Sequence, residues 1–116
     1  MQYIALIYGD PDLLPEHGSD ESNAMMQGYF AANEVYKRDG VFVAGEPLEP
    51  VSTATSLRIR GGKTETMDGP FAETKEQLGG FYIFDCADLD AALKYAALIP
   101  GAKYGTVEVR PIMVLG

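Results

Sequence analysis

Cysteine and histidine are nearly absent from the chain, which has one of each, Cys86 and His17, and no tryptophan. A lone cysteine cannot close an internal disulfide, and one cysteine with one histidine cannot assemble a zinc site. No Gly-x-Gly-x-x-Gly run is present, and Gly61-Gly62-Lys63 lacks the spacing of a phosphate-binding loop. We therefore expect no metal site, no bound cofactor and a reducing, cytoplasmic compartment.

Basic residues are also scarce, because 9 Lys and Arg stand against 17 Asp and Glu, a formal net charge of -8. The averaged field of such a chain repels nucleic-acid phosphates and anionic membranes. No apolar run is long enough to span a bilayer, and residues 1–8 predict a strand rather than a signal peptide. We expect neither nucleic acid nor a membrane as a partner.

The length of 116 residues and an apolar content of 47% predict one folded domain over residues 1–116. Helical spacing of apolar residues predicts helices over 22–38 and 88–99, with Gly40 ending the first and Asp88 capping the second. Alternating or wholly apolar runs predict four strands, over 3–8, 41–44, 80–84 and 106–110. A tight turn at Gly61-Gly62 predicts a hairpin made of 56–60 and 63–67.

This order of elements predicts an α+β fold, a ferredoxin-like βαββαβ sandwich with an extra β-hairpin. In that plan strands 3–8 and 80–84 are central, and both are apolar on both faces. Two helices cover one face of the sheet, so the other face, which carries Ile4 and Leu6, needs a different cover. We expect a second copy to cover it, giving a homodimer. The alternative is that the hairpin or the long loops fold back over that face.

The most distinctive segment begins with Asp-Gly-Pro-Phe-Ala-Glu-Thr-Lys-Glu at residues 68–76. Asp68 can accept backbone N–H bonds, Gly69 can take a conformation that other residues avoid, and Pro70 fixes its own φ. The segment therefore predicts a rigid turn. We expect Phe71 to anchor this turn in the core, and residues 73–77 to form a short helical turn.

Residues 68–76 closely resemble the signature of the DGPF branch of the YCII-related proteins. Residues 1–10, 40–47 and 99–111 resemble other segments of the same family, so the resemblance covers nearly the whole chain. It implies a dimeric α+β barrel, in which two ferredoxin-like sheets face each other across a shared interior.

The resemblance implies no single reaction. Family members are mostly uncharacterised, some are encoded beside extracytoplasmic-function sigma factors, and dimeric α+β barrels at large include cofactor-free isomerases and monooxygenases. A histidine–aspartate dyad has been proposed for YCII-type relatives. It does not map onto this chain, because His17 lies in the loop before the first helix.

Two carboxylates, Asp68 and Glu46, are the candidate catalytic residues. Each lies in a turn rich in Gly and Pro at a strand end, where a half-buried carboxylate can act as a general acid or base. Four further residues are candidates for substrate binding, two as cations for an anionic group and two as aromatic hydroxyls: Lys75, Arg110, Tyr8 and Tyr82. A purely structural interpretation is the alternative, in which Asp68 only caps its turn and the tyrosines are simply packed. Under it, Glu46 and Glu73 form ion pairs with Arg110 or Lys75.

Two functions follow from these observations. The first is a small-molecule enzyme or binder with a pocket near the 68–76 loop in each protomer. The second is a non-catalytic dimeric interaction or regulatory module, linked by the family resemblance to sigma-factor signalling. A roomy cavity beside the candidate residues would favour the first, and charged groups paired with each other would favour the second.

Overall fold

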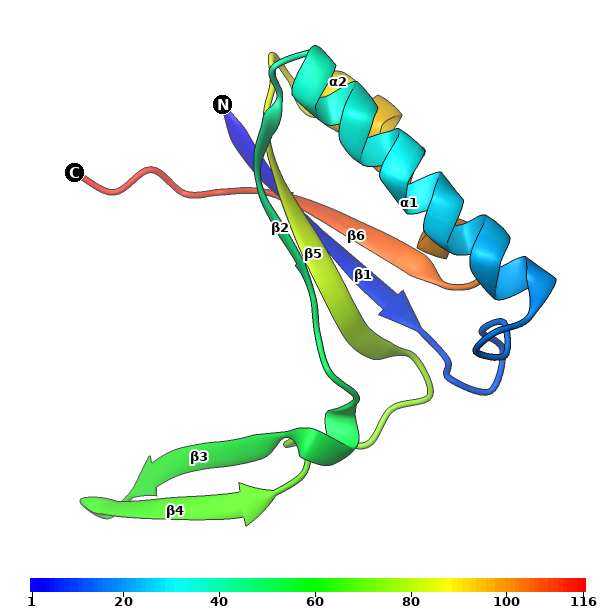
Figure 1. The fold of residues 1–116 in the computed structure, drawn as a ribbon. Coiled ribbons are helices and arrows are strands. Elements are labelled where there is room, and N and C mark those ends of the chain that lie inside the picture. The colour runs from blue at the N-terminus through cyan, green and yellow to red at the C-terminus, as the bar shows by residue number, and fades with distance from the viewer.

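The computed structural model describes residues 1–116 and has the expected order of elements (Figure 1). Its helices and strands are β1 (Gln2–Gly9), α1 (Asp20–Arg38), β2 (Phe42–Pro47), η1 (Val51–Thr53), β3 (Thr55–Arg60), β4 (Lys63–Asp68), β5 (Gln77–Asp85), α2 (Leu89–Ala96), η2 (Pro100–Lys103) and β6 (Thr106–Pro111). Neither α-helix is both long enough and apolar enough to traverse a bilayer.

Four strands form one antiparallel sheet in the order β2-β5-β1-β6. The two central strands are β5 and β1, as their two apolar faces predict, and the ferredoxin-like α+β fold is thereby confirmed. Ala5 and Tyr82, which lie opposite each other, are buried on the face that the helices cover. Ile4 lies opposite Ile83 on the other face, because successive side chains of a strand alternate. No helix covers that second face (Figure 1).

Local capping fixes the helix ends. The Ser19 hydroxyl accepts the backbone N–H of Ser22 at 3.1 Å and starts α1 two residues earlier than the apolar pattern indicated. Gly40, at φ 70°, follows the last turn of this helix as predicted. The carboxylate of Asp88 accepts the N–H of Ala91 at 2.9 Å and caps α2. That helix ends at Ala96, three residues before the predicted end.

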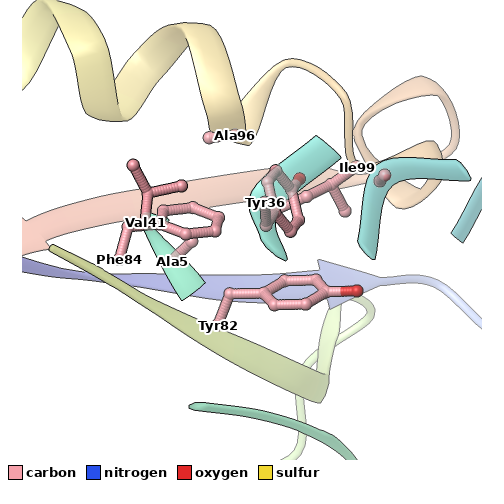
Figure 2. Close-up of a cluster of buried hydrophobic side chains, with 8 residues drawn as sticks. Ala5, Tyr36, Val41, Tyr82, Phe84, Ala96 and Ile99 are labelled. Carbon is pink, nitrogen blue, oxygen red and sulfur yellow. The ribbon is translucent and has the colours of Figure 1, made fainter. Parts of the chain in front are cut away.

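The core lies between the helices and the covered face of the sheet (Figure 2). Tyr36 from α1 is fully buried and meets the rings of Tyr82 and Phe84 from β5 at centroid distances of 5.2 and 4.7 Å. Its hydroxyl donates to the carbonyl of Tyr95 at 2.7 Å, so the buried polar atom is satisfied. Alanines at positions 32, 92 and 96 let both helices lie close to the sheet.

The predicted hairpin forms, but outside the main sheet. Strands β3 and β4 pair only with each other, and Gly61 and Gly62 take positive φ values of 56° and 75° at the turn. Figure 1 shows this hairpin projecting from the end of the sheet, away from the helices. The protomer is correspondingly flat and wide, with extents of 48 × 46 × 17 Å.

Two expectations for the segment after the hairpin are wrong. Phe71 is 87% exposed and does not anchor the turn in the core of the protomer. Residues 73–76 form no helical turn, and β5 already begins at Gln77. Gly69 does take the positive φ, 94°, that the turn was expected to need. Two hydrogen bonds hold the turn. The Gly69 N–H donates to the Ala54 carbonyl at 2.6 Å, and the Ser56 hydroxyl donates to the Gly69 carbonyl at 2.8 Å.

Candidate functional site

A large cavity of about 770 Å³ opens between α1, the β2 edge of the sheet and the segment that follows β2. Residues from five parts of the chain line it: Met25, Met26, Tyr29 and Asn33 from α1, Ile7 and Tyr8 from β1, Gly45 and Glu46 from β2, Gly79 and Tyr82 from β5, and the loop residues Leu48, Glu49 and Pro50.

The central feature of this cavity is a hydrogen bond between a phenol and an amide. The hydroxyl of Tyr82 donates to Oδ1 of Asn33 at 2.6 Å, and only 7% of Tyr82 is exposed. The Tyr82 ring stacks on Phe84 at 5.7 Å with an interplanar angle of 12°, which fixes its orientation. Burial, with a smaller contribution from Tyr29, raises the pKa of Tyr82 to about 12. The phenol therefore stays protonated at neutral pH and acts as a hydrogen-bonding group.

Glycine at position 45 makes room for that tyrosine. A Cβ atom on Gly45 would lie 2.5 and 2.8 Å from Cδ1 and Cε1 of the Tyr82 ring, and 3.2 Å from the Phe81 carbonyl oxygen. Any side chain here would displace the ring. Gly45 on β2 and Tyr82 on β5 therefore pack directly against each other in the cavity wall.

Further polar groups surround the apolar walls. Burial raises the pKa of Tyr29, against a smaller lowering from the backbone of Gly101. The ammonium of Lys37 lies 5.6 Å from the centroid of the Phe42 ring, and both residues line the cavity. The site thus offers neutral phenols, an amide, one cation and the carboxylate of Glu46. No three His, Cys, Asp or Glu side chains are grouped as a metal ion would need.

Three of the six residues singled out from the sequence share this cavity, namely Glu46, Tyr8 and Tyr82. The other three lie elsewhere in the protomer. Asp68 ends β4, in the projecting hairpin, and makes no hydrogen bond that would cap the turn. Lys75 lines a separate polar hollow with Asp10 and Asp12.

Arg110 lies on β6, the edge strand farthest from β2, where its Nε is 3.3 Å from Oε2 of Glu108. The alternative pairing of Glu46 and Glu73 with Arg110 or Lys75 does not occur in the protomer. His17 is exposed in the loop before α1 and does not line the cavity.

Comparison with known proteins places the chain in a family. The model of the YCII-related domain matches residues 1–115. The chain belongs to the YCII-related family. An uncharacterized protein of Rhizobium meliloti (strain 1021) is 40% identical over 114 residues, which cover 97% of this chain and 92% of that relative.

Among solved structures, this YCII-related chain is similar in fold to 5-chloro-2-hydroxyhydroquinone dehydrochlorinase from Burkholderia phenoliruptrix AC1100, in complex with 2,5-dihydroxybenzoquinone. The TM-score is 0.50 with 14% sequence identity, over 97% of this chain and 94% of that one. Such a low identity extends the likeness to the fold and no further.

The most informative residue of this YCII-related site was missed in the sequence. Asn33 lies four residues after Tyr29, so both fall on the helix stripe that faces the sheet. A polar amide on an otherwise apolar stripe is a signal that could have been used, because a polar group placed toward a core needs a partner. The partner, Tyr82, could not be identified from the sequence, because it lies 49 residues away.

Proposed function

We propose that this protein binds a small, flat aromatic or quinonoid molecule carrying hydroxyl or carbonyl groups, in the cavity between α1, β2 and β5. The observation that carries the proposal is the Tyr82–Asn33 hydrogen bond set in the wall of an apolar cavity of about 770 Å³. Small-molecule sites are typically apolar cavities of this size order with a few oriented polar groups.

The chemistry of the lining supports this ligand class. The rings of Tyr29 and Tyr82 and the side chains of Met25 and Met26 suit a planar apolar face. A protonated phenol and an amide can together donate to a carbonyl and accept from a hydroxyl. The dehydrochlorinase of similar fold is named for a hydroxyhydroquinone and was solved with a dihydroxybenzoquinone, a ligand of the same class.

We assign Glu46 the role of general base and Tyr8 and Tyr82 the role of ligand-binding residues. The Glu46 carboxylate would take the proton of a phenolic hydroxyl, leaving a phenolate on the ligand and a neutral carboxyl on the protein. Asp68, Lys75 and Arg110 lie outside this cavity in the protomer, so the acid–base role rests on Glu46 alone. Membership of the DGPF branch is a further proposal, supported by residues 68–76.

Binding of 2,5-dihydroxybenzoquinone and of hydroquinone, measured by calorimetry, tests the proposal. Tyr82→Phe removes the hydroxyl and leaves the ring, so we expect about a tenfold loss of affinity, the equivalent of one hydrogen bond. Glu46→Gln should retain binding and lose any turnover. Arg110→Gln, on the far edge of the sheet, is the matched control and should bind as the wild type does. Equal affinity in the wild type and Tyr82→Phe would refute the assignment.

A non-catalytic dimeric interaction module is the second candidate function. The specific observation in its favour is the projecting hairpin, whose Leu57 and Ile59 side chains are exposed. Under this alternative no quinone or phenol would bind in the cavity, and a protein partner would be retained by the wild type and lost in hairpin variants.

A further inference from the structure

The β3–β4 hairpin has two chemically different faces. Strand alternation and the pairings of Leu57 with Thr66 and of Ile59 with Thr64 place these four side chains on one face. The opposite face carries the ion pair of Arg58 and Glu65, with Nε and Oε2 3.1 Å apart. Asp68, paired with Thr55 at the base of the hairpin, is the one charged residue on the first face. Beyond it the hairpin is an amphipathic ribbon, with one charged face and one uncharged face made by Leu57, Ile59, Thr64 and Thr66.

The uncharged face has no partner in the protomer. Leu57 and Ile59 are 63% and 61% exposed, and Ser56 is the only hairpin residue that is partly buried. The hairpin base is held by two hydrogen bonds, from the Gly69 N–H to the Ala54 carbonyl and from the Ser56 hydroxyl to the Gly69 carbonyl. An isolated two-stranded ribbon is at best marginally stable in water. This ribbon needs a surface to pack against.

The surface area of the protomer indicates how large the missing contact is. The chain exposes 8262 Å², whereas a monomer of 12.6 kDa is expected to expose roughly 6,200 Å². The radius of gyration is 16.2 Å, against about 13 Å for a compact domain of this length. The surplus of about 2,000 Å² exceeds the roughly 800 Å² per partner of a standard interface, and is typical of an obligate dimer.

The shape of the protomer shows where a second copy would lie. Both helices lie on one side of the sheet, whereas the hairpin and the C-terminal tail reach out on the other side (Figure 1). Between them lies the uncovered sheet face with Ile4 and Ile83. The exposed tail residues Met113, Val114 and Leu115 are likewise apolar.

Charge supports a second copy of this chain as the occupant. The hairpin tip carries two cations with no ion-pair partner in the protomer, Arg60 and Lys63, in a chain whose net charge is -8. The rest of the molecule is therefore more acidic than the whole. A positively charged tip is attracted to the acidic surface of another copy, and this charge complementarity orients the two copies.

We propose that the β3–β4 hairpin of each protomer is an arm whose uncharged face packs on a second copy of the chain, and that this contact fixes one wall of the ligand cavity. The statement about the cavity wall rests on the proposed function. The connection is short: Leu48, Glu49, Pro50 and Val51 line the cavity, and only residues 52–54 separate them from β3. Anchoring the arm therefore immobilises the wall.

The experiment compares Leu57→Ser/Ile59→Ser with the wild type by size-exclusion chromatography with light scattering across a dilution series. Met67→Ser is the matched control, because Met67 is an apolar residue on the opposite face of the same hairpin. We expect a wild-type mass of twice 12.6 kDa. The double variant should raise the dimer dissociation constant at least about a hundredfold, since each dimer loses four buried apolar side chains, and the control should leave it unchanged.

A second measurement avoids disrupting the interface. In a Cys86→Ser background, Ile59→Cys should react with a thiol reagent about tenfold more slowly in the concentrated dimer than after dilution, because a packed residue is reached only from the dissociated form. A wild-type mass of 12.6 kDa would overturn the proposal. An unchanged dissociation constant in the double variant would also overturn it, as would an Ile59→Cys labelling rate that is the same before and after dilution.

Calorimetry with 2,5-dihydroxybenzoquinone distinguishes a failure of the arm proposal from a failure of the proposed function. Weaker binding by the monomerised double variant supports the coupling of arm and cavity, and unchanged binding refutes that coupling. If the wild-type dimer binds no quinone or phenol, the proposed function fails. The molar masses of the wild type and the double variant still show whether the arm holds the dimer together.

Discussion

Replacing Gly45 by alanine perturbs the cavity wall at its tightest point. The added Cβ atom would lie 2.5 Å from Cδ1 and 2.8 Å from Cε1 of Tyr82, well inside van der Waals contact. The ring cannot yield freely, because it stacks on Phe84 and its hydroxyl is bonded to Asn33 at 2.6 Å. The Phe81 carbonyl oxygen, 3.2 Å from the new atom, blocks a shift of β2 in its direction.

Overpacking of this kind costs about 1–3 kcal/mol of the free energy of unfolding. For a domain of this length that corresponds to a fall in Tm of roughly 4–12 °C. We also expect weaker binding of 2,5-dihydroxybenzoquinone, since a displaced Tyr82 ring loses its alignment with Asn33. Calorimetric unfolding of wild type and variant at one fixed protein concentration measures the first effect, because association makes Tm depend on concentration.

Gly79→Ala is the matched control. Gly79 also lines the cavity, from β5, but the nearest atom to its added Cβ is the Ile7 carbonyl oxygen at 3.9 Å, an ordinary contact. This variant should keep the wild-type Tm or raise it slightly, because alanine lowers the conformational entropy of the unfolded chain. If Gly45→Ala unfolds at the same temperature as Gly79→Ala, the ring of Tyr82 is not held as described, and the reasoning is refuted.

Two further predictions concern stability. Because burial raises the pKa of Tyr82 to about 12, the neutral phenol stabilises the fold fully below its unfolded value near 10, and this contribution is lost as the pH rises from about 10 toward 12. Urea unfolding across that range should show a steeper decline in the wild type than in Tyr82→Phe, and parallel declines would contradict it. Asp88→Ala removes the cap of α2 and should cost about 1 kcal/mol in urea unfolding. Asp90→Ala, in the first turn of α2, is its control and should cost distinctly less.

The parts of the fold that depend on local chemistry were predictable from the sequence. The two apolar faces of β1 and β5 identified the central strands, and Asp88 and Gly61-Gly62 marked a helix start and a turn at the observed positions. These signals act between neighbouring residues, so they survive without tertiary information. The end of α2 was misplaced by three residues because Leu98 and Ile99 continue the apolar pattern past the last helical turn.

The segment after β4 was not predictable in the same way. Phe71 was expected in the core because large aromatics are usually buried, yet the path of the chain carries it to the surface of the protomer. Whether a side chain is buried depends on where the projecting hairpin leaves the sheet, and no local pattern encodes that direction.

Only part of the candidate site was predictable, namely the residues at the ends of strands that are neighbours in the sheet. Glu46, Tyr8 and Tyr82 meet because β2, β5 and β1 are consecutive in the sheet. Arg110 is separated from them because β6 lies on the opposite edge, and Asp68 because its hairpin leaves the sheet altogether. Chain order alone does not give these distances, which require the strand order and the path of each connection.

The position of the hairpin in the chain also bears on how this architecture can vary. Strands β2 and β5 are antiparallel neighbours, paired as far as Pro47 and Gly80, so a short turn would suffice to join them. Everything between them is an insertion into one reverse turn. Since the entropy of closing a loop rises only slowly with its length, such an insertion can lengthen, shrink or change its side chains without altering the scaffold's own hydrogen bonds. Relatives can therefore exchange this appendage, and acquire new assembly partners, while inheriting the same sheet and helices.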